Sequence, residues 1–537
     1  MNILQQTITE HAKLIPQKIA LKGDSVQIIY QQLPDAIELL WSELLSIEPT
    51  LKNKPHRFAF LLDNHPSWAI LDLTLFFKHQ CAIPLPHFFS TEQLEHALSN
   101  SQANILIIEA SEKKHPLIEK IKDKILSIDS LIIAGKNLLI YVLAKQEQIV
   151  QIAHDKIVKI TYTSGTTAHP KGVALSEQAI LAKVIALAEA CQVSQEDISL
   201  SILPLSTLLE NLGGLYVPLL CGASITLLSP EQTGLKGSSQ LDAKQLLSSL
   251  DQYQPTAFII IPQLLQLFIK LVSSGHPLPD SLRYIAMGGA PVSQQLLTQA
   301  EQLKIPVFEG YGLSEASSVV SVNRPGHNQI GSVGQVLNCH DVLIQAENNI
   351  TACFDQEGEI LVKGHLFNGY LGEQQRLPDD YYATGDIGKL NKDGYLFITG
   401  RKKNIINTSY GRNISPEWIE KELEIIPEIA QCLIYGHSKP FLVALLVLRA
   451  TDNANTNFGS KDKIAERVKN KISDLNQQLP DYARIKDSII LKTPFSLQNN
   501  QLTGTGRPKR TIVYKYYNEQ LERCYEKENR TLTLDHG

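Results

Sequence analysis

Short apolar runs alternate with segments of helical periodicity along most of the chain, which is the pattern expected of an α/β fold. A helix is predicted over Glu177–Cys191, because Ser176 is of a residue type that caps helix N-termini. Six apolar runs are predicted to be strands: Arg57–Asn64, Ala103–Ala110, Lys156–Thr163, Ala223–Ser229, Thr256–Pro262 and Leu282–Gly289.

The pattern changes after about Asp393, where a turn, a strand and a basic run precede a helix predicted to start near Ser415–Pro416. Proline at the first helical position suits such a start. Beyond it lie the strand-like runs "QCLIYG" and "FLVALLVL", a polar helix over Lys461–Leu479, and the strand-like run "SIILKT". These elements predict a small α+β domain of residues 404–537 after a larger domain of residues 1–400.

Composition limits the classes of function. The 537 residues carry a net charge of −5, which gives no basic field for nucleic acid or an anionic membrane. The start of the chain lacks the apolar run of a signal peptide, and "FLVALLVL" is too short to span a bilayer. Because no long apolar run is present, we expect no membrane anchor. The seven cysteines form no close CxxC pair, so we expect reduced thiols in a cytoplasmic protein and no zinc site.

The stretch "ITYTSGTTAHPKGVALS" (Ile160–Ser176) combines hydroxyl residues, two glycines and Lys171. A strand, a Gly/Ser/Thr turn and then a helix would offer N–H groups and hydroxyls to an anion, so we interpret the stretch as a phosphate loop. It fails the Walker A pattern, because no glycine precedes Lys171 and Gly172 follows it. The alternative is a surface loop that happens to be rich in serine and threonine.

The stretch resembles the phosphate loop of the adenylate-forming superfamily of acyl-CoA synthetases, luciferases and peptide-synthetase adenylation domains. Its pattern YTSGTTGxPKG matches Tyr162–Gly172 except at Ala168. Further segments resemble the family's motifs in their order: "LPLSTLLENLGGLYVPLL" (Leu203–Leu220), "MGGAPVS" (Met287–Ser293), "EGYGLSEAS" (Glu309–Ser317), "YYATGDIG" (Tyr381–Gly388) and "LTGTGRPKR" (Leu502–Arg510).

The resemblance implies a large N-terminal domain of layered β-sheets flanked by helices. A small mobile C-terminal domain would rotate about a hinge at residues 401–403, with Lys403 as the hinge residue. It also implies ATP and Mg²⁺ as cofactors and the residues that hold them. The phosphates would lie against Thr163, Ser164, Gly165, Thr166, Thr167 and Lys171, Mg²⁺ against Glu315 and Thr163, adenine against Tyr311, Gly312, Ser314, Gly289, Ala290 and Pro291, and ribose against Asp386 and Arg401.

Several positions depart from the family pattern. Arg507 stands where the last loop usually has its catalytic lysine, and Lys509 follows two places on. Arginine keeps the charge but replaces a compact ammonium with a planar fork. Thr207 takes the place of a histidine that borders the acyl site. Tyr410, before Gly411, is bulky at a loop associated with access of the thiol, and Asn404 replaces an aspartate.

The predicted function is ATP-dependent activation of an apolar, fatty carboxylic acid to acyl-AMP, followed by acyl transfer to CoA. "LPLSTLLEN" offers no aspartate to bind the amino group of an amino acid. Ala257–Val272 would line an acyl tunnel, or form a plain buried strand and helix. The alternatives are a ligase that uses the phosphopantetheine of an acyl carrier protein, a non-catalytic descendant that binds nucleotide, and a luciferase-like oxygenase.

Overall fold

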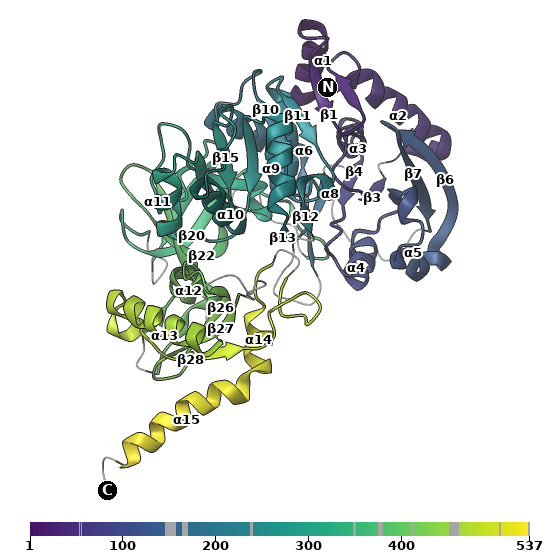
Figure 1. The fold of residues 1–537 in the computed structure, drawn as a ribbon. Coiled ribbons are helices and arrows are strands. Elements are labelled where there is room, and N and C mark those ends of the chain that lie inside the picture. Colours follow the sequence, from purple (N-terminus) through teal and green to yellow (C-terminus); the bar gives the residue numbers. More distant parts are fainter. Residues whose placement is uncertain are drawn as a thin grey trace.

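The computed structural model describes residues 1–52, 54, 56–144, 157–163, 170–236, 240–346, 351–373, 380–409, 412–449, 461–503 and 506–534. A large N-terminal domain lies above a smaller C-terminal domain, from which the last helix projects (Figure 1). Both domains combine helices with sheets, so the predicted α/β fold class, with its large and small domains, is confirmed.

A nine-stranded sheet forms one layer of the large domain. Its strands run in the order β18-β17-β16-β15-β14-β10-β11-β1-β2. The six strands from β16 to β1 are parallel to one another, and β17, β18 and β2 are antiparallel to their neighbours. The apolar runs predicted at Ala223, Thr256 and Leu282 supply β11, β14 and β15. The bounds are β1 Ile19–Lys22, β2 Gln27–Ile29, β10 Ile198–Ser201, β11 Ser224–Leu227, β14 Ala257–Ile260, β15 Tyr284–Met287, β16 Val307–Leu313, β17 Ser318–Val322 and β18 Gln335–Val336.

An eight-stranded sheet, in the order β21-β9-β8-β4-β3-β5-β7-β6, forms a second layer. Strands β8, β4, β3 and β5 are parallel to one another, and the strands at both edges are antiparallel. Its bounds are β3 Arg57–Leu61, β4 Cys81–Pro84, β5 Ile105–Glu109, β6 Ile125–Ile133, β7 Lys136–Leu143, β8 Ile157–Thr163, β9 Lys171–Ser176 and β21 Gly369–Tyr370.

The prediction that a helix directly follows the phosphate loop is wrong. Strand β9 follows the loop and pairs antiparallel with β8, which sets Lys171 opposite Thr163. Residues 173–175 are fully buried, and this burial favours another sheet strand over an exposed turn leading into a helix. The helix α6 (Glu177–Ala190) begins only after β9, where the Ser176 hydroxyl accepts a hydrogen bond from the Ala179 N–H at 3.2 Å, as predicted.

Helices pack between and around these layers. Every residue of α3 (Pro66–Phe77) is buried, and its apolar side chains share one core with α6 and with residues of both large sheets. Such a helix must lie inside the domain, because no face of it meets water. The other helices of the large domain are α1 Ile3–Leu14, α2 Leu33–Ile47, α4 Thr91–Ser101, α5 Pro116–Ile121, α7 Val217–Leu220, α8 Pro230–Thr233, α9 Ala243–Tyr253, α10 Pro262–Ser273 and α11 Gln294–Gln302.

A four-stranded antiparallel sheet, β19 (His340–Gln345), β20 (Gly358–Gly364), β22 (Tyr382–Leu390) and β23 (Leu396–Arg401), leads to the small domain. The small domain follows the predicted order of elements, and Pro416 occupies the first turn of α12. Its elements are β24 Ile406–Asn407, β25 Asn413–Ile414, α12 Pro416–Glu424, β26 Ile429–Tyr435, β27 Leu442–Leu448, α13 Lys461–Gln478, β28 Ile485–Leu491, α14 Arg510–Tyr516 and α15 Asn518–Leu534.

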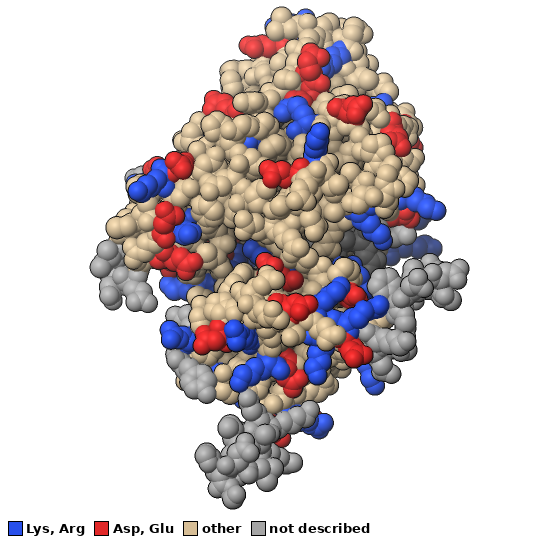
Figure 2. All heavy atoms as spheres, turned by 60° about the vertical axis from the view of Figure 1, so that its left-hand side comes forward, with Lys and Arg blue, Asp and Glu red and all other residues tan. Residues whose placement is uncertain are grey.

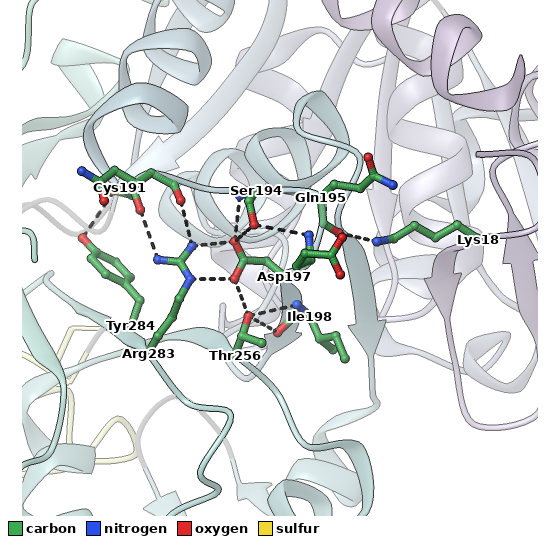
Figure 3. A network of polar contacts seen from close by, with 11 residues as sticks. Lys18, Cys191, Ser194, Gln195, Asp197, Ile198, Thr256, Arg283 and Tyr284 are labelled. Carbon is green, nitrogen blue, oxygen red and sulfur yellow. Dashed lines mark hydrogen bonds and ion pairs between the residues drawn. The ribbon is translucent and has the colours of Figure 1, made fainter. Parts of the chain in front are cut away.

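A polar network fastens the amino ends of β10, β14 and β15 (Figure 3). Asp197 receives hydrogen bonds from Arg283 at 2.7 and 2.5 Å, from the Thr256 hydroxyl at 2.6 Å and from the Ser194 N–H at 2.8 Å. Burial raises the pKa of Asp197, but these hydrogen bonds outweigh it and the net shift is downward. The carboxylate thus ties together three parallel strands at the edge from which each begins.

Replacing Asp197 with Ala is expected to lower the free energy of unfolding by about 3 kcal/mol, because Arg283 and Thr256 lose their shared partner. The folded-state pKa is depressed, so this stabilisation is present at neutral pH and disappears as the pH falls through that value. Thermal unfolding at pH 7 and pH 3 measures both effects. Asp251→Ala, on the exposed side of α9, is the control, and an equal loss in the two variants would contradict the role of the network.

The π-helical turn η5 (Glu210–Tyr216) buries a carboxyl group completely. Neither oxygen of Glu210 makes a hydrogen bond within the described residues. Burial raises the pKa of Glu210 to about 8, although the Ser201 hydroxyl and the Leu203 N–H oppose the shift without reaching hydrogen-bond geometry. A Cβ atom at Gly214 would lie 2.3 Å from the carboxyl, so glycine makes room for it.

A raised folded-state pKa means that stability falls as the pH rises from the unfolded value of 4.5 towards 8. Replacing Glu210 with Gln removes the ionisation. The free energy of unfolding of the variant should therefore rise relative to that of the parent by up to about 1.4 kcal/mol per pH unit in that window. Melting temperatures of both proteins at pH 5, 6, 7 and 8 test this. The exposed Glu231→Gln serves as control, and parallel pH profiles for parent and Glu210→Gln would refute the buried neutral carboxyl.

Candidate functional site

The predicted site residues gather where strands of the large domain end. Thr163 is the last residue of β8, Gly289 follows β15, and Tyr311 and Gly312 lie near the end of β16. In sheets with parallel strands, binding sites form outside the carboxyl ends of the strands. The anchoring network at Asp197 occupies the opposite edge of the nine-stranded sheet, so one edge is fastened and the other carries the predicted site residues.

Asp386 is the centre of one half of the site. It lies on β22 opposite Arg401 of β23, and the Arg401 Nε atom is 2.6 Å from its Oδ1 atom. The Tyr311 hydroxyl donates to Oδ2 at 2.7 Å. Burial, followed by the nearby Asp386 charge, raises the pKa of Tyr311 well above its usual value, which keeps the phenol protonated as a donor. The predicted adenine and ribose residues therefore lie together.

Glu315 and Lys171 form the other half through a residue that the motifs did not identify. The Tyr370 hydroxyl donates to Glu315 Oε1 at 2.5 Å and lies 3.2 Å from the Tyr382 hydroxyl. The Lys171 ammonium stands over the Tyr370 ring at 4.5 Å from its centre and pairs with Glu373 at 2.9 Å. The cation predicted for phosphate and the carboxylate predicted for Mg²⁺ thus meet at one tyrosine.

The turn that carries Glu315 has a constrained backbone. Ser317 and Ser318 have φ angles of +53° and +93°, in the region that non-glycine residues seldom occupy. A Cβ atom at Gly312 would lie 1.9 Å from the Ser318 carbonyl oxygen, so only glycine fits between β16 and β17. Such constraint is found where the chain must aim a particular side chain, here Glu315 towards Tyr370.

The small domain reaches this site through the loop before α14. Arg507 donates a hydrogen bond to the carbonyl oxygen of Gly289. Burial lowers the pKa of Arg507, and the nearby positive charge of Arg401 lowers it further. Lys509 does not join them, because its ammonium contacts Asn500 Oδ1 at 2.5 Å within the small domain. Of the two cations predicted for this role, the structure brings Arg507 alone to the residues predicted to bind the nucleotide.

Residues of the predicted hinge line a cavity beside Asp386. Its volume is about 290 Å³, and its walls are Thr384, Gly385, Arg401, Lys402 and Lys403. Partial burial, with Arg401 and Arg507 nearby, lowers the pKa of Lys403. Three cationic side chains therefore surround one hollow next to the carboxylate predicted to bind ribose.

The remaining predicted residues surround these two halves or fall outside the described chain. Ala290 and Pro291 follow Gly289, and Ser314 precedes Glu315. Thr207 donates its hydroxyl to the Pro204 carbonyl at 2.8 Å and lies at the start of the turn leading to η5. The residues of the predicted site that lie outside the described part are Ser164, Gly165, Thr166, Thr167, Tyr410 and Gly411.

A magnesium ion fits this residue set without a dedicated metal cluster. Among the described residues no group of three or more His, Cys, Asp or Glu side chains could hold a metal. Magnesium nevertheless binds nucleotide sites through one or two carboxylates together with phosphate oxygens and water. Glu315 would supply such a carboxylate. Within the described residues, no helix combines the length and apolar character needed to cross a membrane.

Known proteins resemble this chain over nearly its whole length. Long-chain-fatty-acid–CoA ligase 1 of Cavia porcellus is 26% identical, with 92% of this chain and 82% of that protein covered. The 2-succinylbenzoate–CoA ligase of Bacillus velezensis is 27% identical, with 81% and 85% covered.

Solved structures share the fold. An anthranilate CoA ligase in complex with anthranoyl-AMP has a TM-score of 0.76 at 17% identity, with 96% of this chain and 97% of that chain covered. An o-succinylbenzoate CoA synthetase from Bacillus subtilis, with ATP and magnesium ion, has a TM-score of 0.70 at 21% identity, with 94% and 98% covered.

Two family models match the chain in sequence order. The model of the AMP-binding enzyme covers residues 8–371, and the model of the AMP-binding enzyme C-terminal domain covers residues 403–529. The first match alone spans more than half of the chain and includes Lys171, Tyr311, Glu315 and Tyr370. The resemblance to the adenylate-forming superfamily is thereby confirmed, and the chain belongs to the AMP-binding enzyme family.

Proposed function

We propose that the protein is an AMP-forming acid–CoA ligase. The first half-reaction joins a carboxylic acid to the α-phosphate of ATP and releases pyrophosphate, and the second transfers the acyl group to the thiol of CoA and releases AMP. The observation that carries the proposal is the meeting of Lys171 and Glu315 at Tyr370. The cation proposed for phosphate and the carboxylate proposed for magnesium are neighbours, as binding of a nucleoside triphosphate would require.

Lys171 would exchange its exposed pairing with Glu373 for the β- and γ-phosphates of ATP. Glu315 would hold Mg²⁺ together with Thr163, the second residue that the family resemblance assigns to the metal. The ion screens the charge of the phosphates when it is bound. Tyr370 would keep the Glu315 carboxylate aimed during this exchange, because its hydroxyl already donates to that carboxylate. The phosphates then present less negative charge to the attacking carboxylate.

Asp386 and Arg401 would bind the ribose. A carboxylate accepts hydrogen bonds from both hydroxyls of a ribose, and Arg401 holds the Asp386 oxygens in place for this. Tyr311 would release its hydrogen bond to Asp386, or share it, and place its ring against adenine. Gly289, with a φ of +86°, lets the backbone turn close to the base.

Arg507 would guide the substrate carboxylate towards the α-phosphate. Its guanidinium stands at the Gly289 carbonyl, near Arg401 and Asp386, so it reaches the adenine side of the site. A planar guanidinium binds carboxylate or phosphate oxygens in pairs, which suits a group that brings the two together. In the proposed mechanism, this arrangement of the small domain would serve adenylation. Transfer to the thiol then requires rotation about Lys403.

The substrate class we propose is an apolar carboxylic acid, with fatty acids as the first candidates. Leu209 and Ile261 lie 3.7 and 3.8 Å from where Cβ atoms would stand on Gly288 and Gly289, so apolar side chains border the end of β15. The relatives named for long-chain fatty acids favour this choice, and those named for succinylbenzoate favour an aromatic acid. CoA is the proposed acceptor of the acyl group. The alternative acceptor is the phosphopantetheine of a carrier protein, and a titration with CoA would distinguish the two.

The direct test is pyrophosphate release with ATP, Mg²⁺ and a panel of fatty and aromatic acids. Glu315→Ala is expected to lower the release more than about 100-fold, because the carboxylate that holds the metal is lost. Glu373→Gln removes a neighbouring exposed carboxylate and is expected to stay within about threefold of the parent. ATP binding without release for any acid would indicate the non-catalytic descendant and would overturn the proposal.

A second test separates the half-reactions at the hinge. Lys403→Pro should leave acid-dependent pyrophosphate release within about threefold of the parent and abolish thioester formation, because proline restricts the backbone that must turn. Lys402→Ala, at the neighbouring exposed position, is the control and should support both half-reactions. Full thioester formation by Lys403→Pro would show that the hinge lies elsewhere.

A further inference from the structure

A buried ion pair connects the strand before the phosphate loop with a helix inside the large domain. Figure 2 shows lysine, arginine, aspartate and glutamate side chains on the surface, where water solvates their charges. Asp72 of α3 and Lys159 of β8 are instead 0% and 1% exposed, and the Lys159 ammonium lies 2.8 and 2.9 Å from the two Asp72 oxygens. Two charges removed from water need further hydrogen bonds around them.

The turn η5 supplies those hydrogen bonds. The Asn211 amide donates to Asp72 Oδ2 at 3.0 Å, and its oxygen accepts from Lys159 at 2.5 Å. The Tyr216 hydroxyl donates to the same Asp72 oxygen at 2.8 Å, and the centre of its ring lies 4.9 Å from the Lys159 ammonium. Burial, followed by the Asp72 charge, raises the pKa of Tyr216 well above its usual value, so the phenol stays a donor. Side chains from α3, β8 and η5 therefore form one network enclosed in the core.

The spacing of the two donors fits the π-helical form of η5. Asn211 and Tyr216 are five positions apart, and both donate to one carboxylate oxygen. In an α-helix of about 3.6 residues per turn, residues five apart point about 140° away from each other around the axis. A π-helix forms its hydrogen bonds between residues i and i+5, which brings such residues towards one face. The shared oxygen of Asp72 therefore favours the π-helical form, which is rare and often lies at functional sites.

The start of η5 belongs to the segment that the family resemblance assigns to the acyl site, here called the acyl segment (residues 203–216). The Asn211 N–H donates to the carbonyl oxygen of Thr207 at 3.0 Å. The buried Asn64 side chain donates to the Leu203 carbonyl and accepts from the Leu205 N–H, both at 2.8 Å. The acyl segment is thus held at its start by this amide and at its end by the ion pair.

The other side of the ion pair lies on the phosphate strand. Lys159 is the third residue of β8 and stands four positions before Thr163, with which the strand ends. Strand β8 is itself fixed by β4 on one side and by β9 on the other. Apolar side chains often replace a buried ion pair without loss of stability, so stability alone does not account for this one. A satisfied polar network adds a single defined arrangement, here of the turn relative to the strand.

We propose that Asp72 and Lys159 are positioning residues that hold η5 in its π-helical form and so set the acyl segment at Thr207 against the phosphate strand β8. The inference rests on the proposed function, because it concerns how the acid is aligned with ATP. Loss of the network should raise the KM for the acid and lower kcat, with the KM for ATP unchanged. A residue needed only for folding would lower the amount of active enzyme and change neither KM.

The test compares two double variants that remove both charges. Asp72→Leu with Lys159→Met leaves Asn211 and Tyr216 without their shared oxygen, whereas Asp72→Asn with Lys159→Met offers Tyr216 an amide oxygen and Asn211 an amide N–H. In acid-dependent ATP–pyrophosphate exchange, kcat/KM for the acid should fall about tenfold in the first and stay within about threefold of the parent in the second. The KM for ATP should stay within about twofold in both. Both variants should melt within about 5 °C of the parent, because neither leaves an unpaired buried charge.

Asp197→Ala is the matched control, because it breaks the ion pair of a buried carboxylate at the opposite edge of the nine-stranded sheet. It should lower the melting temperature and leave both KM values within about twofold of the parent. An acid KM in the Asp72→Leu, Lys159→Met variant equal to that of the parent would overturn the inference. An equal rise of the acid KM in the control would overturn it as well.

Hydrogen exchange of peptides from the acyl segment gives a readout that needs no activity. Exchange should rise there when Asp72→Leu is combined with Lys159→Met, and it should return towards the parent when Asp72→Asn is used instead. The same exchange in both variants would contradict the role of the shared oxygen. If the parent activates no acid while exchange follows the expected pattern, the proposed function fails and the hold of the ion pair on η5 stands.

Discussion

The ion pair between Arg401 and Asp386 is the interaction on which the rest of the site depends. It joins two neighbouring strands, binds the Tyr311 hydroxyl from the nine-stranded sheet, and lies at the predicted hinge of residues 401–403. Asp386 is almost fully buried, so an unpaired carboxylate there would carry a large desolvation penalty. The pair therefore stabilises the junction of two sheets and holds in place the carboxylate that we propose as the ribose acceptor.

The second constraint is the convergence of separate sheets at one edge. Strand β21 pairs with β9, which places Tyr370 next to Lys171, and the Tyr370 hydroxyl reaches Glu315 after β16 of the other large sheet. The opposite edge is fastened at Asp197, so the strands are anchored where they begin and carry polar groups where they end. A nucleotide bound across this junction would contact groups from all three sheets of the large domain that meet there.

Much of the fold and part of the site could be predicted from the sequence. Apolar runs located β3, β5, β8, β11, β14, β15 and β26 to β28, but not strands such as β4, β10 and β16. Ser176 marked the start of α6 and Pro416 that of α12. The hairpin of β8 and β9 was missed, because a buried strand of six residues is hard to distinguish from the first turns of a helix. Tyr370 was missed because its contact with Glu315 depends on the pairing of β21, which no spacing along the chain reveals. The choice between Arg507 and Lys509 likewise required the placement of the small domain.

The central claim is that one nucleotide spans both halves of this site, with its ribose on Asp386 and its phosphates at Lys171. A crystal structure with ATP and magnesium, or with an unreactive acyl-adenylate analogue, measures this most directly. The account predicts both ribose hydroxyls within hydrogen-bond distance of Asp386 and a phosphate or metal beside Glu315. A nucleotide bound elsewhere, with the Tyr311–Asp386 and Tyr370–Glu315 contacts unchanged, would contradict it.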